Sequence, residues 1–410
     1  MININKFKDK KGRKDMSHSI NANISHAFYY TFASHGKIED FAGMVRNLFP
    51  GSVHYDLSME TDDAYIKDMQ TAERFLHGGG QTYQVCRFFM KDICPDLKAA
   101  GFSGWCVMLS YFEGSDIISI SFHYSLSDAT TDKIIAIRQS GVNKKYQFAD
   151  KTYSCFELAE KIRVALGLSQ HVEISYLCEI TKFGDYTDID DIEKDETGLL
   201  YGILTGDEGY DFVPEHLAQE RLKSSWGSRD FIRIYASRQA FLFLNLLNTP
   251  KHVAYLERQT QFGTQIYGGC DPYFYMGECP LTVNHGILFS VEFVMMLKAL
   301  INEVLTFQTE HSKKKFSSYY RRISATRELR RKIIKVLEKV ERTEISEIGE
   351  LSAMLMISQH IAPIVDQVKY LLELLEGDLT LIYSEQNNML VTILTVLGLI
   401  LAFWQILLAF

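Results

Sequence analysis

The C-terminal end of the chain is the feature that most restricts its fold. Residues 386–410 contain no charged side chain, and from Met389 onward they read MLVTILTVLGLILAFWQILLAF. A bilayer core of about 30 Å needs roughly 20 apolar residues in a helix, and a helix satisfies its own backbone there. We therefore predict a transmembrane helix over residues 386–410. A buried core helix is the less favoured alternative for so long an apolar run.

The few polar residues near this segment follow helical spacing. Asn388, Thr392 and Thr395 share one face of the predicted helix with Glu385 and, two turns earlier, Asp378. A polar face on a membrane helix is expected to contact protein or water. Repeated around a symmetry axis, the carboxylates would concentrate cations at a pore mouth. The predicted pore-lining residues are therefore Asp378, Glu385, Asn388, Thr392 and Thr395.

The cysteines, the N-terminal residues and the net charge indicate where the chain resides. Its seven cysteines are odd in number and form no CxxC pair, which is typical of free thiols in a reducing compartment. Residues 1–14 are rich in lysine and lack the apolar region of a secretory signal. We expect the inner (plasma) membrane, with the N-terminal domain in the cytoplasm. The net charge of -8 leads us to expect no direct binding of DNA or RNA.

The first two thirds of the chain predict an α+β domain. After a disordered basic N-terminus, residues 1–20, we predict a mixed sheet flanked by helices over residues 21–285. Asp185–Glu196 is an acidic stretch without the glycine and terminal glutamate of an EF-hand, which predicts a solvated loop and not a calcium site. The predicted strands are 105–112, 117–124, 172–180, 199–204, 231–236 and 240–246, and the predicted helices are 61–76 and 156–166.

Residues 286–385 predict a helical stalk region. Residues 287–305 are apolar but carry charges, which predicts a packed helix and no second membrane span. From Met354 to Leu375 apolar residues recur at alternating steps of three and four, the pattern of a coiled coil. Pro363 lies inside this repeat and predicts a kink or a junction. The partner of the seam is a neighbouring helix or a second copy, and continuity with the polar membrane face favours a homo-oligomer.

Charge separates sharply along the helical region. Residues 313–342 have a net charge of +9, and residues 343–388 have a net charge of -7. Either the two segments pair with each other, or each has its own function. In the functional interpretation, guanidinium groups bind phosphate and aromatic rings stack on bases, so the ligand is a small anionic nucleotide. The candidate ligand-binding residues are Lys315, Tyr319, Arg321, Arg322, Arg327, Arg330 and Arg331.

The sequence carries no recognised catalytic motif. It lacks GxxxxGK[ST], GxGxxG, GxSxG and HExxH, and its histidines show no metal-ligand spacing. We therefore predict that the chain is not an enzyme, has no catalytic residue and needs no cofactor. The identity of any metal-binding residue stays open.

The end of the chain resembles a known family. YLLELLEGDLTLIYSEQNNMLVTILTVLGLI, residues 370–400, is similar to the end of the stalk helix and the first membrane helix of CorA-like divalent-metal transporters. Gln386, Asn387, Met389, Leu394 and Thr395 occupy similar places. The order of parts also fits, with an α/β domain, long helices, a stalk and then membrane. Residues 1–410 contain no Gly-Met-Asn signature like that of the transporters, and no second membrane helix is predicted within them.

The resemblance implies two functions. CorA-like proteins without that signature occur as antiviral membrane effectors in type III CRISPR systems, where a nucleotide made from S-adenosylmethionine and ATP is the activator. The first expectation is thus a homo-oligomeric channel that a nucleotide of this type opens. The expected partners of the chain are further copies of itself, the lipid bilayer and the nucleotide. The alternative is a Mg2+ or Co2+ transporter of the CorA family. A third possibility is a tail-anchored scaffold or nucleotide-processing enzyme.

Overall fold

A computed structural model describes most of the chain. It covers residues 20–34, 38–48, 53–56, 83–89, 106–112, 116–143, 146–148, 151–247, 249–255, 257–258, 294–304, 306, 324, 327–334 and 346–409. The predicted helix 61–76 lies outside these ranges, as does the predicted disordered N-terminus, residues 1–20, except for Ile20.

A mixed sheet of nine strands forms the centre of the body, in the order β2-β3-β4-β5-β1-β8-β11-β10-β9. Neighbouring strands are antiparallel except β8 and β11, which are parallel. The predicted α+β class with a mixed sheet flanked by helices is confirmed. The strands are β1 Asn21–Ser34, β2 Val53–Asp56, β3 Tyr83–Phe89, β4 Cys106–Phe112, β5 Ile117–Thr130, β8 Leu168–Phe183, β9 Ser225–Arg229, β10 Ile232–Ser237 and β11 Ala240–Asn245, and a separate hairpin joins β6 Tyr146–Phe148 to β7 Lys151–Tyr153.

The first strand in the sequence, β1, lies in the middle of this sheet. Phe28 pairs with Phe122 of β5 on one side and with Tyr176 of β8 on the other. Both faces of β1 are covered, since Phe28, Tyr29 and Tyr30 are each at most 1% exposed. A strand buried on both faces contributes more apolar area to the core than an edge strand. We therefore regard β1 as the central strand of the hydrophobic core.

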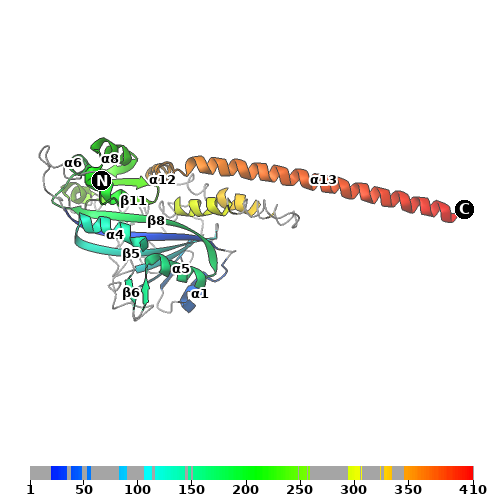
Figure 1. Cartoon of the computed structure of the whole chain (residues 1–410), viewed down its shortest axis with the longest axis horizontal. Helices are drawn as coiled ribbons and strands as arrows, with labels where there is room; N and C mark the ends of the chain where they lie inside the picture. The colour runs from blue at the N-terminus through cyan, green and yellow to red at the C-terminus, as the bar shows by residue number, and fades with distance from the viewer. Residues whose placement is uncertain are drawn as a thin grey trace, which may run out of the picture.

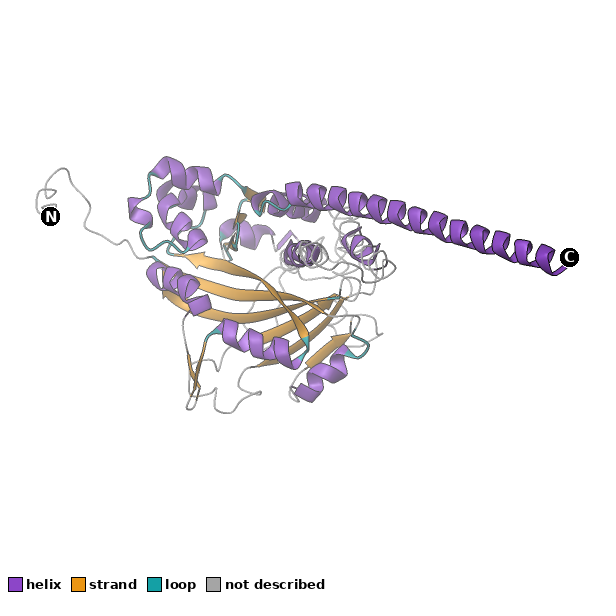
Figure 2. Ribbon diagram, turned by 45° about the vertical axis from the view of Figure 1, so that its right-hand side comes forward, coloured by secondary structure: helices purple, strands orange, loops and turns teal. Residues whose placement is uncertain are grey.

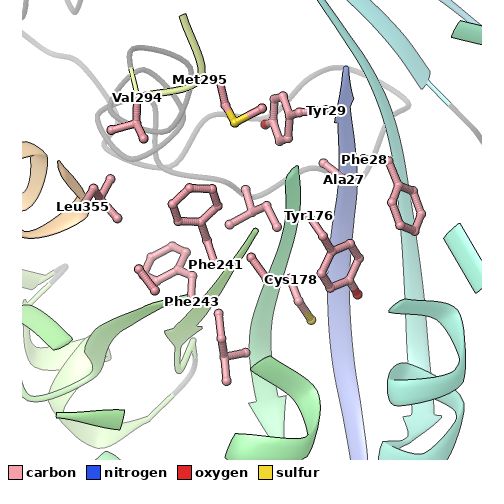
Figure 3. Close-up of a cluster of buried hydrophobic side chains, with 14 of the residues drawn as sticks. Ala27, Phe28, Tyr29, Tyr176, Cys178, Phe241, Phe243, Val294, Met295 and Leu355 are labelled. Carbon is pink, nitrogen blue, oxygen red and sulfur yellow. The ribbon is translucent and has the colours of Figure 1, made fainter. Parts of the chain in front are cut away.

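Helices cover both faces of the sheet (Figures 1 and 2). One face carries α4, Thr131–Asn143, and α5, Cys155–Ala165. The other carries the helix over residues 294–304 and α12, Ser346–Ser358. In Figure 3, Met295 lies near Tyr29, and Leu355 of α12 lies near the phenylalanines of β11. Shorter helices of the body are α1 Phe41–Leu48, α6 Ile189–Asp195, α7 Thr197–Thr205 and α8 Glu215–Leu222.

The local sequence explains where α5 begins. The Ser154 side chain accepts a hydrogen bond from the Glu157 amide at 3.2 Å, and Glu157 Oε2 accepts one from the Ser154 amide at 2.7 Å. This reciprocal capping box satisfies two amides that the helix itself leaves without partners. The predicted helix 156–166 is confirmed, with its start at Cys155.

Two local predictions are wrong. The predicted strand 199–204 is part of α7, because Leu199, Leu200 and Ile203 are buried on several sides of a helix and give no clear periodicity. The predicted loop 185–196 contains α6, which begins after Asp188; the Asp188 side chain accepts a hydrogen bond from the Asp190 amide at 3.0 Å. An acidic residue at a helix start is favourable, so the acidic stretch contains a helix and not only a loop.

The longest element is α13, Ala362–Ala409, which projects from the body (Figure 1). The predicted junction at Pro363 is confirmed: α12 ends at Ser358, His360 adopts φ 57°, and Pro363 lies in the first turn of α13. The apolar repeat from Met354 is therefore divided between two helices. Within the residues that the structure describes, no helix has both the length and the apolar character required to cross a membrane. The predicted transmembrane helix is thus not found there.

Candidate functional site: a basic helix between the sheet and α13

The helix over residues 327–334 contains the described part of the basic segment. Leu329 is 5% exposed and Ile333 is 2% exposed, so these two side chains anchor the helix in the hydrophobic core. The basic side chains lie on other sides of the helix. Arg327, Arg330 and Arg331 are largely accessible, whereas Lys332 is buried. The helix therefore presents charge on two sides of an apolar anchor.

On the accessible side, two arginines contact the same carboxylate of α13. Arg330 Nη1 pairs with Glu376 Oε2, and Arg327 Nε lies 3.6 Å from Glu376 Oε1. These contacts support the interpretation in which the basic and acidic segments pair with each other. The side chain of Arg330 is 42% exposed, that of Arg327 66% and that of Glu376 28%. Solvent therefore screens the interaction.

A groove of about 580 Å³ lies beside this ion pair. Its wall is made by Arg330 together with a row of α13 residues, and Gly377 leaves space on the helix because no atom lies within 4 Å of the position that a Cβ would occupy there. Sites for small organic ligands have volumes of about 300–1,000 Å³. The groove is large enough for part of a nucleotide. It is lined by Arg330, Glu373, Glu376, Gly377, Thr380 and Ser384.

On the buried side, the helix is tied to the sheet. Lys332 Nζ lies 3.0 Å from Asp116 Oδ2, with the two side chains 7% and 9% exposed. Tyr111 donates its hydroxyl hydrogen to Asp116 Oδ1 at 3.3 Å, and its oxygen accepts from the Ile38 amide at 3.0 Å. Asp116 has φ 55° and directly precedes β5. A charged pair so well buried holds only where further hydrogen bonds satisfy it.

The structure brings together only some of the predicted ligand-binding residues. Arg327 and Arg330 meet at Glu376, and Arg331 lies on the same short helix with an exposed side chain. The other candidates, Lys315, Tyr319, Arg321 and Arg322, lie outside the described residues. Their role in binding a nucleotide stays a prediction.

The predicted pore-lining residues all lie on α13. Asn388, Thr392 and Thr395 are exposed, and the threonine hydroxyls donate to the carbonyls of Asn388 and Val391 at 2.8 and 2.7 Å. The structure describes the helical backbone of Asp378 and Glu385 but not their side chains. Every residue from Asn387 to Leu401 is exposed, including large apolar side chains with exposed fractions of 46% to 66%.

Two rows of buried hydroxyl groups cross the sheet and were not predicted. The register places Ser110, Ser119 and Thr31 in one row, and Ser121, Tyr29 and Ser175 in the next, on the face toward the helix 294–304. All six are at most 1% exposed. The sequence signal for these rows is the alternation of small polar and apolar residues along β5. The same alternation is typical of a strand with one face exposed to solvent, so it does not reveal that the polar face is buried. Among the residues that the structure describes, the hydroxyl oxygens of Thr31, Ser119 and Ser175 have no hydrogen-bond partner.

Two histidines are buried on opposite faces of neighbouring strands. Burial lowers the pKa of His26 and of His123 from 6.5 to about 3, and for His123 the proximity of His26 adds to the effect. His123 Nε2 lies 2.7 Å from Ser121 Oγ, and His26 packs edge-on against Phe28 with ring centroids 5.6 Å apart. Both rings are therefore neutral in the folded protein near neutral pH.

The two described cysteine side chains are buried and kept in the neutral form. The two cysteines with described side chains, Cys155 and Cys178, are free thiols, and burial raises the pKa of Cys178 to about 12. Burial raises the pKa of Cys155 as well. A thiol held in its neutral form is a poor nucleophile. Among the described residues, no three His, Cys, Asp or Glu side chains are grouped as a metal site.

The fold and these contacts define a class: an α+β protein in which a basic helix connects the central sheet to a long exposed helix. Comparison with known proteins found no match to this chain among protein-family models, curated proteins or solved structures.

Proposed function

We propose that the chain is one subunit of a homo-oligomeric, membrane-inserted channel whose α+β body is a sensor. The observation that carries the proposal is the exposure of α13 from Asn387 to Leu401, where large apolar side chains have no cover on any side. Burying one such side chain away from water is favourable by a free energy of about 1.5–3 kcal/mol. A contiguous apolar surface of this size is expected to be covered by lipid or by other copies.

Length and charge favour lipid as the cover. The described side chains of α13 end at Leu401, but in the sequence the run without a charged side chain continues from Met389 to Phe410. As one helix, residues 389–410 would span about 33 Å at 1.5 Å per residue. The body would then stay on one side of the membrane, which we propose to be the cytoplasmic side of the plasma membrane. The two cysteines with described side chains, Cys155 and Cys178, are free thiols, which agrees with that side.

The polar face of α13 favours a pore. Asn388, Thr392 and Thr395 lie within about 100° of one another around a helix of 3.6 residues per turn, and facing lipid they would be unfavourable. One helix cannot enclose a pore, so the subunits must associate. The intrahelical hydrogen bonds of Thr392 and Thr395 leave their oxygens able to accept from water or to contact a cation.

For the ligand, we propose a small anionic nucleotide of the S-adenosylmethionine–AMP type, and for the biological role, membrane permeabilisation in type III CRISPR antiviral defence. The resemblance of residues 370–400 to CorA-like proteins supports the role. Arg330, which lines a groove of about 580 Å³, and Arg327, which shares Glu376 with it, support the ligand.

Dye release from liposomes tests the proposal. The full chain is reconstituted in vesicles with a trapped fluorescent dye, and ATP or a conjugate of S-adenosylmethionine with AMP is added outside. We expect release only with the conjugate. Absence of release with every nucleotide would reject the gated channel. Uptake of Mg2+ or Co2+ without any nucleotide would instead support the CorA-type transporter.

A further inference from the structure

The helix 327–334 is held by two ion pairs of different kinds. Lys332 and Asp116 form a buried pair that Tyr111 also supports. Arg327 and Arg330 form an accessible pair with Glu376 of α13. Breaking a buried pair is strongly unfavourable, whereas an exposed pair contributes little and can exchange partners. The helix is thus fixed to the sheet and only loosely held to α13.

The accessible contact has the chemistry of an anion site that is already filled. A carboxylate and a phosphate bind guanidinium groups through the same donors, and Glu376 uses donors of both arginines. The adjoining groove gives an incoming anion access to Arg330. Glu373 and Glu376 both line that groove, so an anion entering it is repelled as long as Glu376 keeps its place.

We propose that Glu376 is an internal competitor of the anionic ligand. Binding of the ligand's phosphate to Arg327 and Arg330 displaces the Glu376 carboxylate and releases α13 from the helix 327–334, which stays fixed to the sheet through Lys332. The identity of the ligand as a nucleotide rests on the proposed function. The displacement itself requires only a phosphate-bearing anion that binds the released state better than the paired one.

Two isosteric variants test the competition. Glu376→Gln removes the competing charge, and Glu373→Gln is the matched control, since Glu373 lines the same groove but forms no ion pair with the described arginines. A fluorescent ATP analogue is titrated onto each full chain in detergent, with inorganic pyrophosphate as the displacing anion. We expect Glu376→Gln to bind the analogue about two- to fivefold more tightly than wild type, the factor that a partly exposed ion pair contributes.

The control is expected to change affinity less than Glu376→Gln does, because only Glu376 competes for the donors. Adding Arg330→Gln to Glu376→Gln should abolish the gain. Equal or weaker binding by Glu376→Gln, an equal gain in both variants, or no binding of the analogue to any chain would overturn the proposal. Melting temperatures of all variants are measured first, and Glu376→Ala replaces Glu376→Gln if that variant does not fold.

The same variants separate this proposal from the channel. In liposomes, Glu376→Gln should release dye at a lower nucleotide concentration than wild type, by the same two- to fivefold factor, because the coupling between two sites is reciprocal. Tighter binding by Glu376→Gln without dye release from any chain would leave the competition standing and reject the channel. Dye release that all chains share at equal nucleotide concentration would reject the competition and support the channel.

Discussion

At the residue scale, the hydroxyl rows of the central sheet make a direct prediction. The Thr31 hydroxyl is fully buried and has no hydrogen-bond partner within the described part of the chain. A buried polar group without a partner costs about 1–3 kcal/mol. Thr31→Val keeps the shape and removes that cost. We expect the free energy of unfolding to rise by about 1 kcal/mol, measured by urea denaturation of the detergent-solubilised chain.

Ser121 supplies the control for this variant. Its hydroxyl lies 2.7 Å from His123 Nε2, so Ser121→Ala removes a hydrogen bond and should lower stability by about 1 kcal/mol. If Thr31→Val were instead as destabilising as Ser121→Ala, the Thr31 hydroxyl would hold an ordered water or a ligand.

The buried histidines predict how stability depends on pH. Their pKa values are lowered from 6.5 to about 3 in the folded state, so the unfolded chain binds more protons between these values. Their contribution to stability is complete above pH 6.5 and is lost as the pH falls toward 3. The loss is about 1.4 kcal/mol per pH unit for each histidine.

His123→Gln isolates one of the two contributions. Gln can keep a hydrogen bond to Ser121, so the variant should fold. Between pH 6 and 4.5, urea denaturation should show a shallower loss of stability than wild type, by about 1.4 kcal/mol per unit. Parallel curves for the two proteins would show that His123 is protonated in the folded state.

At the element scale, the buried pair between the helix 327–334 and β5 is the contact that should matter most for stability. Lys332→Met leaves the Asp116 carboxylate buried with the Tyr111 hydroxyl as its described donor. We expect a loss of about 3 kcal/mol in the free energy of unfolding. Adding Asp116→Asn should restore most of it, because Asn tolerates the positive φ of 55° at this position.

The exposed pair on the same helix is the comparison. Arg327→Gln should cost less than about 1 kcal/mol, since Arg327 is 66% exposed. Thermal and urea denaturation of the three variants measure these differences. A loss for Lys332→Met no larger than that for Arg327→Gln would contradict the anchoring role of Lys332.

Elements with a clear local pattern could be predicted from the sequence, and elements without one could not. The strand predictions at 105–112, 117–124, 172–180, 231–236 and 240–246 correspond to β4, β5, β8, β10 and β11. The central strand β1 was missed because both of its faces are buried, so its later part, residues 27–33 (AFYYTFA), shows no regular alternation of apolar and polar residues. For α7 the same lack of periodicity led to the wrong class.

The candidate site was predictable only in part, because its ion pairs depend on tertiary packing and not on a local sequence pattern. The charge segregation located the basic segment, but which carboxylate meets which arginine depends on how the helix 327–334 packs against α13. Lys332 and Asp116 are more than 200 residues apart in the sequence, and neither belongs to a motif. Their pairing follows from tertiary structure alone.

At the scale of the whole molecule, matched lysine substitutions on α13 test the orientation of its exposed segment. Leu397 lies opposite the face of Asn388, Thr392 and Thr395, as 100° per residue dictates. Leu397→Lys puts a charge on the lipid side, at a cost of about 3 kcal/mol near the helix centre. We expect it to reduce the membrane-bound fraction, measured by flotation with liposomes.

Thr395→Lys is the companion variant on the polar face. It should stay in the membrane fraction and reduce cation leakage, because its charge would face the pore. Equal loss of both variants from the membrane would show that α13 has no preferred polar face, and equal retention of both would argue that the segment is not inserted.

The central position of β1 has a consequence for how the chain is made. Its partner β8 ends at Phe183, so at about 5–20 residues per second β1 leaves the ribosome roughly 7 to 30 s before β8 is complete. During that time an aromatic, β-rich segment has an unpaired edge, the kind of segment that chaperones protect from aggregation. The last sheet strand, β11, ends at Asn245, well before Met389 is synthesised. All strands of the described sheet can therefore pair before the apolar part of α13 is made, and translation itself orders the two events.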